Sequence, residues 1–104
     1  MRGEALKSQL ELLLLATLER EPAHGYQIVE DLKGRSAGVL DFPEGSVYPA
    51  LYRLERGGLV TSRWHRVEGR RRRVYRLTRR GRSELSAKRG EWKTIVRAMR
   101  AVLA

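Results

Sequence analysis

Leucines near the start of the chain recur at the spacing of one helix face. Five of them are separated in turn by four, three, one and four positions, which predicts an α-helix. These five are Leu6, Leu10, Leu13, Leu14 and Leu18. Leu12 and Leu15 fall outside that stripe, and a helix that is apolar on more than one side needs a second cover, for which a second subunit is expected. Glu21 should end the helix, because a residue before proline is disfavoured in helices.

A second, shorter helix is predicted over residues 24–33. Its apolar face consists of Ile28, Val29 and Leu32. His24, at its start, is expected to cap the helix or to pack against it. Residues 35–45 contain two glycines and a proline, which predicts a loop, and Phe42 is expected to anchor this loop in the core.

Residues 46–56 form a third predicted helix, which the glycine pair at 57–58 should end. Pro49 limits how early this helix can begin, because proline fits best in a first turn. The buried side is expected to hold Val47, Leu51 and Leu54. The opposite side holds Ser46, Pro49, Tyr52, Arg53 and Arg56. Since this outer face carries a phenol and two guanidinium groups and no acid, it suits the major groove of DNA.

A hairpin is predicted next, because residues 59–67 and 72–77 alternate in the manner of strands. Residues 68–71 are assigned to the turn between them. Trp64 and Tyr75 are expected to pack the hairpin onto the helices; stacking of Trp64 on nucleic-acid bases is the alternative.

A long final helix should follow Thr78, a residue type that caps helix starts well. Its apolar residues form two parallel rows, with seven-residue spacing within each. One row consists of Leu85, Trp92 and Met99, and the other consists of Ile95 and Val102. Such a seam is typical of helices that pair between subunits. Together with the surplus leucines of the first helix it predicts a homodimer. The expected interface residues are Leu12, Leu15, Leu85, Trp92, Ile95, Met99 and Val102.

Charge is concentrated over the predicted hairpin. Ten arginines and a single acid, Glu68, lie between Arg63 and Arg82, and the whole chain of 104 residues has a net charge of +10. A polyanion is therefore the expected partner, either nucleic acid or an anionic membrane. The longest apolar run, residues 12–16, is too short to cross a membrane, so nucleic acid is favoured. A charge run that is merely solvated is the alternative interpretation.

Catalysis, metal binding and cofactor binding find no support in the sequence. The chain has no cysteine, which excludes disulfides and thiolate sites and is compatible with the cytoplasm. His24 and His65 are far apart and have no spaced partner ligands. Ser46 follows a glycine at a helix start but lacks the flanking pattern of a nucleophile elbow. No catalytic residue, metal or cofactor is therefore predicted.

The order helix, helix, loop, helix, hairpin, long helix predicts an α+β, mostly helical fold of the winged helix-turn-helix type. Three phrases then resemble the PadR family of bacterial transcriptional regulators: HGYQI at 24–28, EGSVYPALYRLE at 44–55, and YRLT at 75–78 followed by Gly81. The resemblance covers about residues 10–92. The family often has a proline in the wing and Pro-Glu after the Leu-Thr pair, where this chain has Arg71 and residues Arg79 and Arg80.

The resemblance implies a homodimer that represses transcription at a palindromic operator, with the third helix in the major groove and the hairpin, or wing, on the backbone or in the minor groove. It also implies a DNA-binding domain at residues 1–77 and a dimerisation helix at 78–104 in one structural unit, as in the subfamily with a short C-terminal domain. The extra arginines favour strong backbone affinity over sequence discrimination.

The DNA-binding residues are expected to be Ser46, Tyr48, Tyr52, Arg53, Arg70, Arg71 and Arg72. Tyr48 is assigned to a phosphate because it is rotated toward the side of the helix. Arg53 is assigned either to a guanine edge or to a phosphate. Trp92 is either a residue of the dimer seam or the site of a planar aromatic effector, and both roles are compatible.

Two other functional classes stay open. A basic nucleoid-type or RNA-binding protein without sequence readout would share the charge but would not need a polar outer face on the third helix. A drug-binding or protein-interaction module that has lost its operator is the third possibility.

Overall fold

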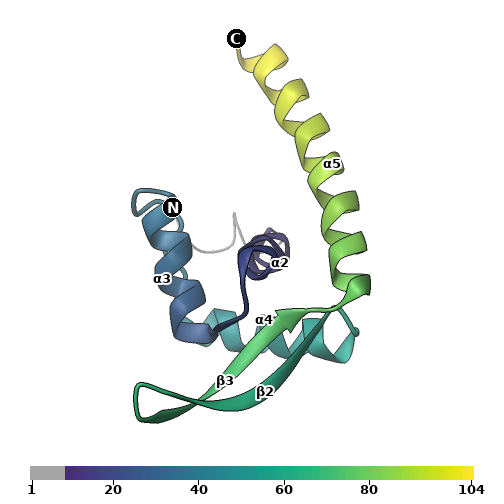
Figure 1. Cartoon of the computed structure of the whole chain (residues 1–104). Coiled ribbons are helices and arrows are strands. Elements are labelled where there is room, and N and C mark those ends of the chain that lie inside the picture. The colour runs from purple at the N-terminus through teal and green to yellow at the C-terminus, as the bar shows by residue number, and fades with distance from the viewer. Residues whose placement is uncertain (1–8) are drawn as a thin grey trace.

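The computed structural model describes residues 9–104, which form four α-helices and three strands. In chain order these are α2 (Leu10–Arg20), β1 (Ala23–His24), α3 (Gly25–Arg35), α4 (Glu44–Arg56), β2 (Val60–Val67), β3 (Arg70–Leu77) and α5 (Arg79–Leu103). Helices α2, α3 and α4 form a body beside the hairpin of β2 and β3, and α5 rises away from that body (Figure 1). The predicted α+β, mostly helical winged helix-turn-helix fold is confirmed. Leu6 lies outside the described residues.

Helix α2 occupies the centre of the core and contacts α3, α4, β3 and α5. Its neighbours therefore cover more than one of its sides, which accounts for its surplus of leucines. Leu15 is 0% exposed within the single chain, so its assignment to a dimer interface is wrong. Leu85 is 1% exposed because the first half of α5 packs on the body, and its interface assignment is wrong for the same reason.

His24 caps α3, as expected. Its Nδ1 accepts a hydrogen bond from the Gln27 backbone N–H at 3.3 Å, and its own backbone N–H donates to Gln27 Oε1 at 3.0 Å. Burial lowers the pKa of His24, and the positive charge of Arg72 lowers this pKa further. The neutral ring is thereby favoured, and only a neutral ring can accept the capping bond at Nδ1.

The sheet has the order β1-β3-β2 and is antiparallel throughout. Strand β1 was not predicted, because a two-residue strand is too short to show alternation. The turn between β2 and β3 is shorter than predicted: Val67 faces Arg70, so only Glu68 and Gly69 connect the strands. Arg70 and Arg71 belong to β3 instead, where their side chains hide the alternation because both are charged.

Helix α4 begins at Glu44, two residues earlier than predicted, and Pro49 lies inside it. Proline removes one hydrogen bond to the carbonyl four residues earlier, that of Gly45. Both residues are exposed, so water can reach the carbonyl, and the helix continues through them. The predicted end at Arg56 is confirmed, and so are the expected core positions. These are Phe42, Val47, Leu51 and Leu54.

Helix α5 begins at a cap and ends as a projecting arm. The Thr78 hydroxyl accepts from the Gly81 backbone N–H at 3.0 Å and donates to the Gly58 carbonyl at 2.7 Å, which confirms the predicted cap. Further along, Arg89 Nη2 lies 2.8 Å from Glu19 Oε1 and ties α5 to α2. The C-terminal half then extends beyond the body (Figure 1). No helix within residues 9–104 has the length and apolar character needed to cross a membrane.

Candidate nucleic-acid interface

The outward face of α4 is centred on Tyr52 and Arg56. Tyr52 is 61% exposed, and the Arg56 guanidinium carbon lies 5.8 Å from the centre of its ring. At 100° per residue these two positions lie opposite the buried Val47 and Leu54. Arg56 was assigned to the outer face by sequence analysis but was not included among the predicted binding residues.

Arg53 and Ser46 lie on one flank of α4, and Arg53 contacts α2. Arg53 Nε is 3.4 Å from Glu11 Oε2, and both side chains are substantially exposed. An exposed ion pair of this kind contributes about 0–1 kcal/mol, so Arg53 can leave it at little cost. Arg53 therefore lies less directly on the outward face than Arg56, although Arg53 and not Arg56 is among the residues predicted to bind DNA.

Tyr48 lies on the other flank of α4, against the start of α3. A Cβ atom added to Gly25 would come within 2.6 Å of the Tyr48 ring, so this close approach needs a residue without a side chain. Burial raises the pKa of Tyr48, the carboxylate of Glu44 raises it further, and the charge of Arg72 lowers it. The charge of Arg72 in the wing thus acts on Tyr48 of α4, and both residues were predicted to contact DNA.

The three predicted wing arginines do not form one patch. Side chains alternate between the two faces of a strand, so Arg71 lies on one face of β3 while Arg70 and Arg72 lie on the other. The face of Arg71 is shared with Trp64 and Arg73, which are directly opposite each other in the pairing of β2 and β3.

Trp64 does not pack the hairpin onto the helices, and that prediction is wrong. Its side chain is 54% exposed, and the guanidinium carbons of Arg71 and Arg73 lie 4.8 and 5.5 Å from its ring centre. Tyr75, by contrast, is buried as expected. Trp64 lies on the same face of the hairpin as Tyr75 but nearer the turn, since Trp64 pairs with Arg73 whereas Tyr75 pairs with Ser62.

A polar network connects the wing to α4. The Ser62 hydroxyl lies 2.8 Å from Glu55 Oε2 and 2.8 Å from Arg73 Nε, so it donates to the carboxylate and accepts from the guanidinium. Arg73 Nη2 is also 3.9 Å from Glu55 Oε2. Sequence analysis did not identify this network, because its three members are charged or polar residues on separate elements.

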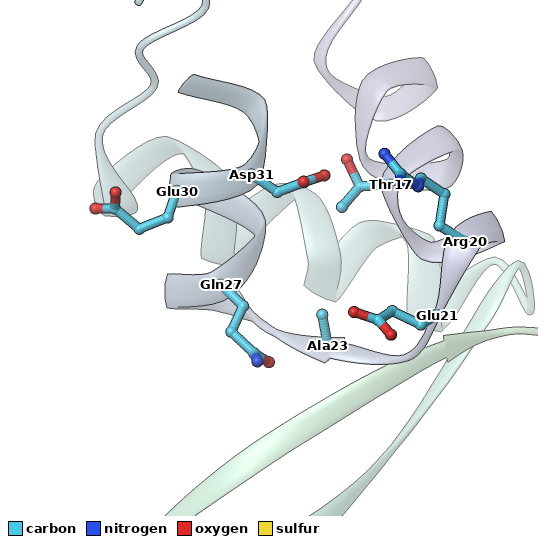
Figure 2. Close-up of a pocket in the computed structure, with 7 residues that line it drawn as sticks. All are labelled: Thr17, Arg20, Glu21, Ala23, Gln27, Glu30 and Asp31. Carbon is cyan, nitrogen blue, oxygen red and sulfur yellow. The ribbon is translucent and has the colours of Figure 1, made fainter. Parts of the chain in front are cut away.

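A cleft between α2, β1 and α3 has the opposite character. Figure 2 shows its lining, which consists of Thr17, Arg20, Glu21, Ala23, Gln27, Glu30 and Asp31. Three carboxylates accompany one guanidinium there, so this face disfavours phosphate. Within the part of the chain that the structure describes, no group of three or more His, Cys, Asp or Glu residues could hold a metal ion.

The outer half of α5 presents an open apolar face on the single chain. Trp92, Ile95 and Met99 are each about half exposed, at 42%, 51% and 54%. Together with Val96, Arg100 and Leu103 they line a shallow hollow. Val102, also predicted for the interface, is exposed, whereas Leu12 is partly buried against the core.

Comparison with known proteins agrees with this geometry. Residues 14–87 match the model of the transcriptional regulator PadR-like family. The chain belongs to this family. It is 35% identical over 83 residues to the transcriptional regulator Rv3488 of Mycobacterium tuberculosis, an alignment that covers 80% of this chain and 75% of the relative. The PadR-like family consists of transcriptional regulators and not of enzymes.

Solved structures of PadR family members share the fold. A PadR family transcription regulator from Clostridium difficile has a TM-score of 0.81 at 31% identity, with 91% of this chain and 98% of that chain covered. Bacillus subtilis PadR, whose structure was solved in complex with operator DNA, has a TM-score of 0.68 at 26% identity, with 75% of this chain and 45% of that chain covered.

Proposed function

We propose that this PadR-like regulator is a homodimer that binds a palindromic DNA operator and represses transcription. One observation carries the proposal: an exposed helix face with a phenol and a guanidinium lies beside an arginine-rich wing on the same chain. A helix of this size fits the major groove, and guanidinium groups bind phosphates and guanine edges. Such a protein works where the chromosome lies, so the cytoplasm is part of the proposal.

The geometry supports a division of roles along this surface. Tyr52 and Arg56 point most directly outward and are assigned to base edges, with Ser46 and Arg53 at the border of the groove. Tyr48 and Arg72 are assigned to one phosphate, because the charge of Arg72 acts on Tyr48, which packs against Gly25 at the N-terminus of α3. Backbone N–H groups at a helix N-terminus also favour phosphate.

The wing is assigned mainly to the DNA backbone. Arg70 and Arg71 lie on opposite faces of β3, so the wing can touch DNA from either side. The relative from Bacillus subtilis was crystallised with operator DNA, which supports carrying this role to the present chain.

The homodimer is supported by the apolar face of α5. Trp92, Ile95, Met99 and Val102 form a stripe that the body of the same chain does not cover. Pairing two such helices would bury the stripe and place two copies of α4 on one side of a duplex. A planar aromatic compound between paired Trp92 rings is a further part of the proposal, supported by the open apolar hollow at that residue.

Selection of bound fragments from random duplex DNA tests the function. We expect an enriched palindrome with half-sites about one helical turn apart, ~34–36 Å, if both copies of α4 enter the major groove on one face. Binding without any enriched sequence would instead support a nucleoid-type protein, and preference for RNA over duplex DNA would support an RNA-binding protein.

Two arginine variants then test the role of α4. We expect Arg56→Ala to weaken binding to the selected operator by about 1–3 kcal/mol and to relax preference at one base pair. Arg53→Ala, on the flank, is expected to cost less and to weaken operator and scrambled duplex equally. Titration of both duplexes, followed by fluorescence anisotropy, distinguishes a contact with a base from a contact with the DNA backbone. Equal losses for Arg56→Ala on both duplexes would reassign Arg56 to the backbone.

A further inference from the structure

The most unusual side chain of the wing is Trp64. Its side chain is 54% exposed and contributes little to the core. Two guanidinium groups nevertheless lie over its ring. Arg71 lies closer, at 4.8 Å from the ring centre, and Arg73 lies at 5.5 Å. Both distances are within the range of a cation–π interaction.

The two arginines differ in their other partners. Arg73 also contacts Ser62 and Glu55, and the contact with Glu55 attaches it to α4. None of the ion pairs among the described residues includes Arg71. The positive charge of Arg71 is therefore not offset by a carboxylate, whereas that of Arg73 is.

These contacts form a continuous series from α4 to the outer part of the wing. Glu55 contacts Ser62 and Arg73, Arg73 contacts Trp64, and Trp64 contacts Arg71. Each contact restricts the next side chain. The series thus fixes the position of the Arg71 guanidinium relative to the helix that faces the groove.

We infer that Trp64 is a positioning residue that holds Arg71 ready for a DNA phosphate at a fixed distance from α4. A free arginine loses rotamer freedom when it binds, and stacking on a rigid ring removes part of that freedom beforehand. Arg71 then binds phosphate more tightly than an arginine of equal charge without a ring. The inference rests on the proposed DNA-binding function.

A double-mutant cycle tests this coupling. The probe is a fluorescein-labelled duplex of random sequence, about three helical turns long, because contacts with phosphate do not depend on sequence. Trp64→Ala is expected to weaken binding about 2- to 5-fold, the loss that corresponds to one exposed cation–π contact. Arg71→Ala should then cause a smaller loss of affinity in the Trp64→Ala background than in the original protein.

Arg70 provides the matched control, since it is the neighbouring arginine on the opposite face of β3 and none of the cation–π contacts among the described residues includes it. The fold-losses of affinity caused by Arg70→Ala and Trp64→Ala should be independent, so the double variant should lose the product of the two. If the fold-losses of affinity caused by Arg71→Ala and Trp64→Ala are also independent, the inference is overturned. It is overturned as well if Trp64→Ala binds the duplex like the original protein.

Trp64→Phe supplies a second variant, which keeps a smaller ring. It should recover part of the affinity lost in Trp64→Ala, and equal weakness of the two would also contradict the inference. Melting temperatures of all variants should agree closely, because Trp64 lies outside the core. Absence of duplex binding by the original chain would instead contradict the proposed binding to DNA, so the two failures can be distinguished.

Discussion

Gly81 shows how one missing side chain can bring two segments together. It lies in the first turn of α5, where its backbone N–H donates to the Thr78 hydroxyl. The Thr78 backbone N–H in turn donates to the Leu59 carbonyl at 3.1 Å. A Cβ atom on Gly81 would overlap that same Leu59 carbonyl oxygen, so the start of α5 and the segment before β2 can approach this closely only with glycine.

Gly81→Ala is expected to destabilise the protein by about 1–3 kcal/mol, because the added methyl group forces the backbone of Leu59 or of α5 to move. Gly34→Ala is the matched control. Gly34 is also helical, but a Cβ atom there meets nothing within 4 Å, so alanine should be neutral or stabilise by up to about 1 kcal/mol. Urea unfolding measures both, and equal stabilities of the two variants would contradict the close approach at Gly81.

At the scale of elements, the two-residue turn determines the shape of the wing. Glu68 and Gly69 have positive φ angles of 50° and 78°, which corresponds to the turn type that matches the twist of antiparallel strands. Glycine adopts this conformation without strain, whereas a non-glycine residue in the left-handed region costs roughly 1–2 kcal/mol. Asparagine tolerates this region better than glutamate does.

Glu68→Asn should therefore stabilise the hairpin, but it also removes a negative charge from an arginine-rich surface. Glu68→Gln removes the same charge without improving the conformation, and it serves as the control. We expect the free energy of unfolding to be about 0.5–1 kcal/mol higher for Glu68→Asn than for Glu68→Gln. Thermal unfolding followed by circular dichroism provides the comparison. A glutamine variant as stable as the asparagine variant would show that strain at position 68 is negligible.

At the scale of the whole molecule, α5 belongs to the body over its first half and stands apart over its second half. Leu85 is buried in the core, and the pair of Arg89 with Glu19 lies near the point where α5 leaves the body. Beyond that point the apolar side chains of the stripe are exposed, and Figure 1 shows that the helix continues away from the body. The direction of the arm would thus set the separation of the two DNA-binding surfaces in the proposed dimer.

Ile95→Glu should convert the proposed dimer to a monomer, because it places a charge in the middle of the apolar stripe. Thr94→Glu adds the same charge one residue earlier, about 100° around the helix and away from the stripe, and should leave the dimer intact. Analytical ultracentrifugation distinguishes the two states. If the original chain is a monomer, or if both variants are dimers, α5 does not form the dimer interface.

Several parts of the fold follow from the sequence because they depend on neighbours a few residues apart. The spacing of the leucines, the cap at Thr78 and the stop at Gly57 are local signals, and the structure confirms the elements that they predict. The phrases at 24–28 and 44–55 also pointed to the family that the comparison shows. The binding surface was predicted only in part, since alternation along β3 separates Arg71 from Arg70 and Arg72.

The sequence by itself determined which residues are apolar, which are charged and where the helices and the wing lie. Only the tertiary structure decided what covers each apolar side chain. Leu15 and Leu85 are enclosed by their own chain, whereas Trp92 and Ile95 are not, although all four lie in similar helical patterns. The physical reason is that helix periodicity indicates which face of a helix is buried but not which element covers it. The covering element is set by contacts between segments far apart in the chain.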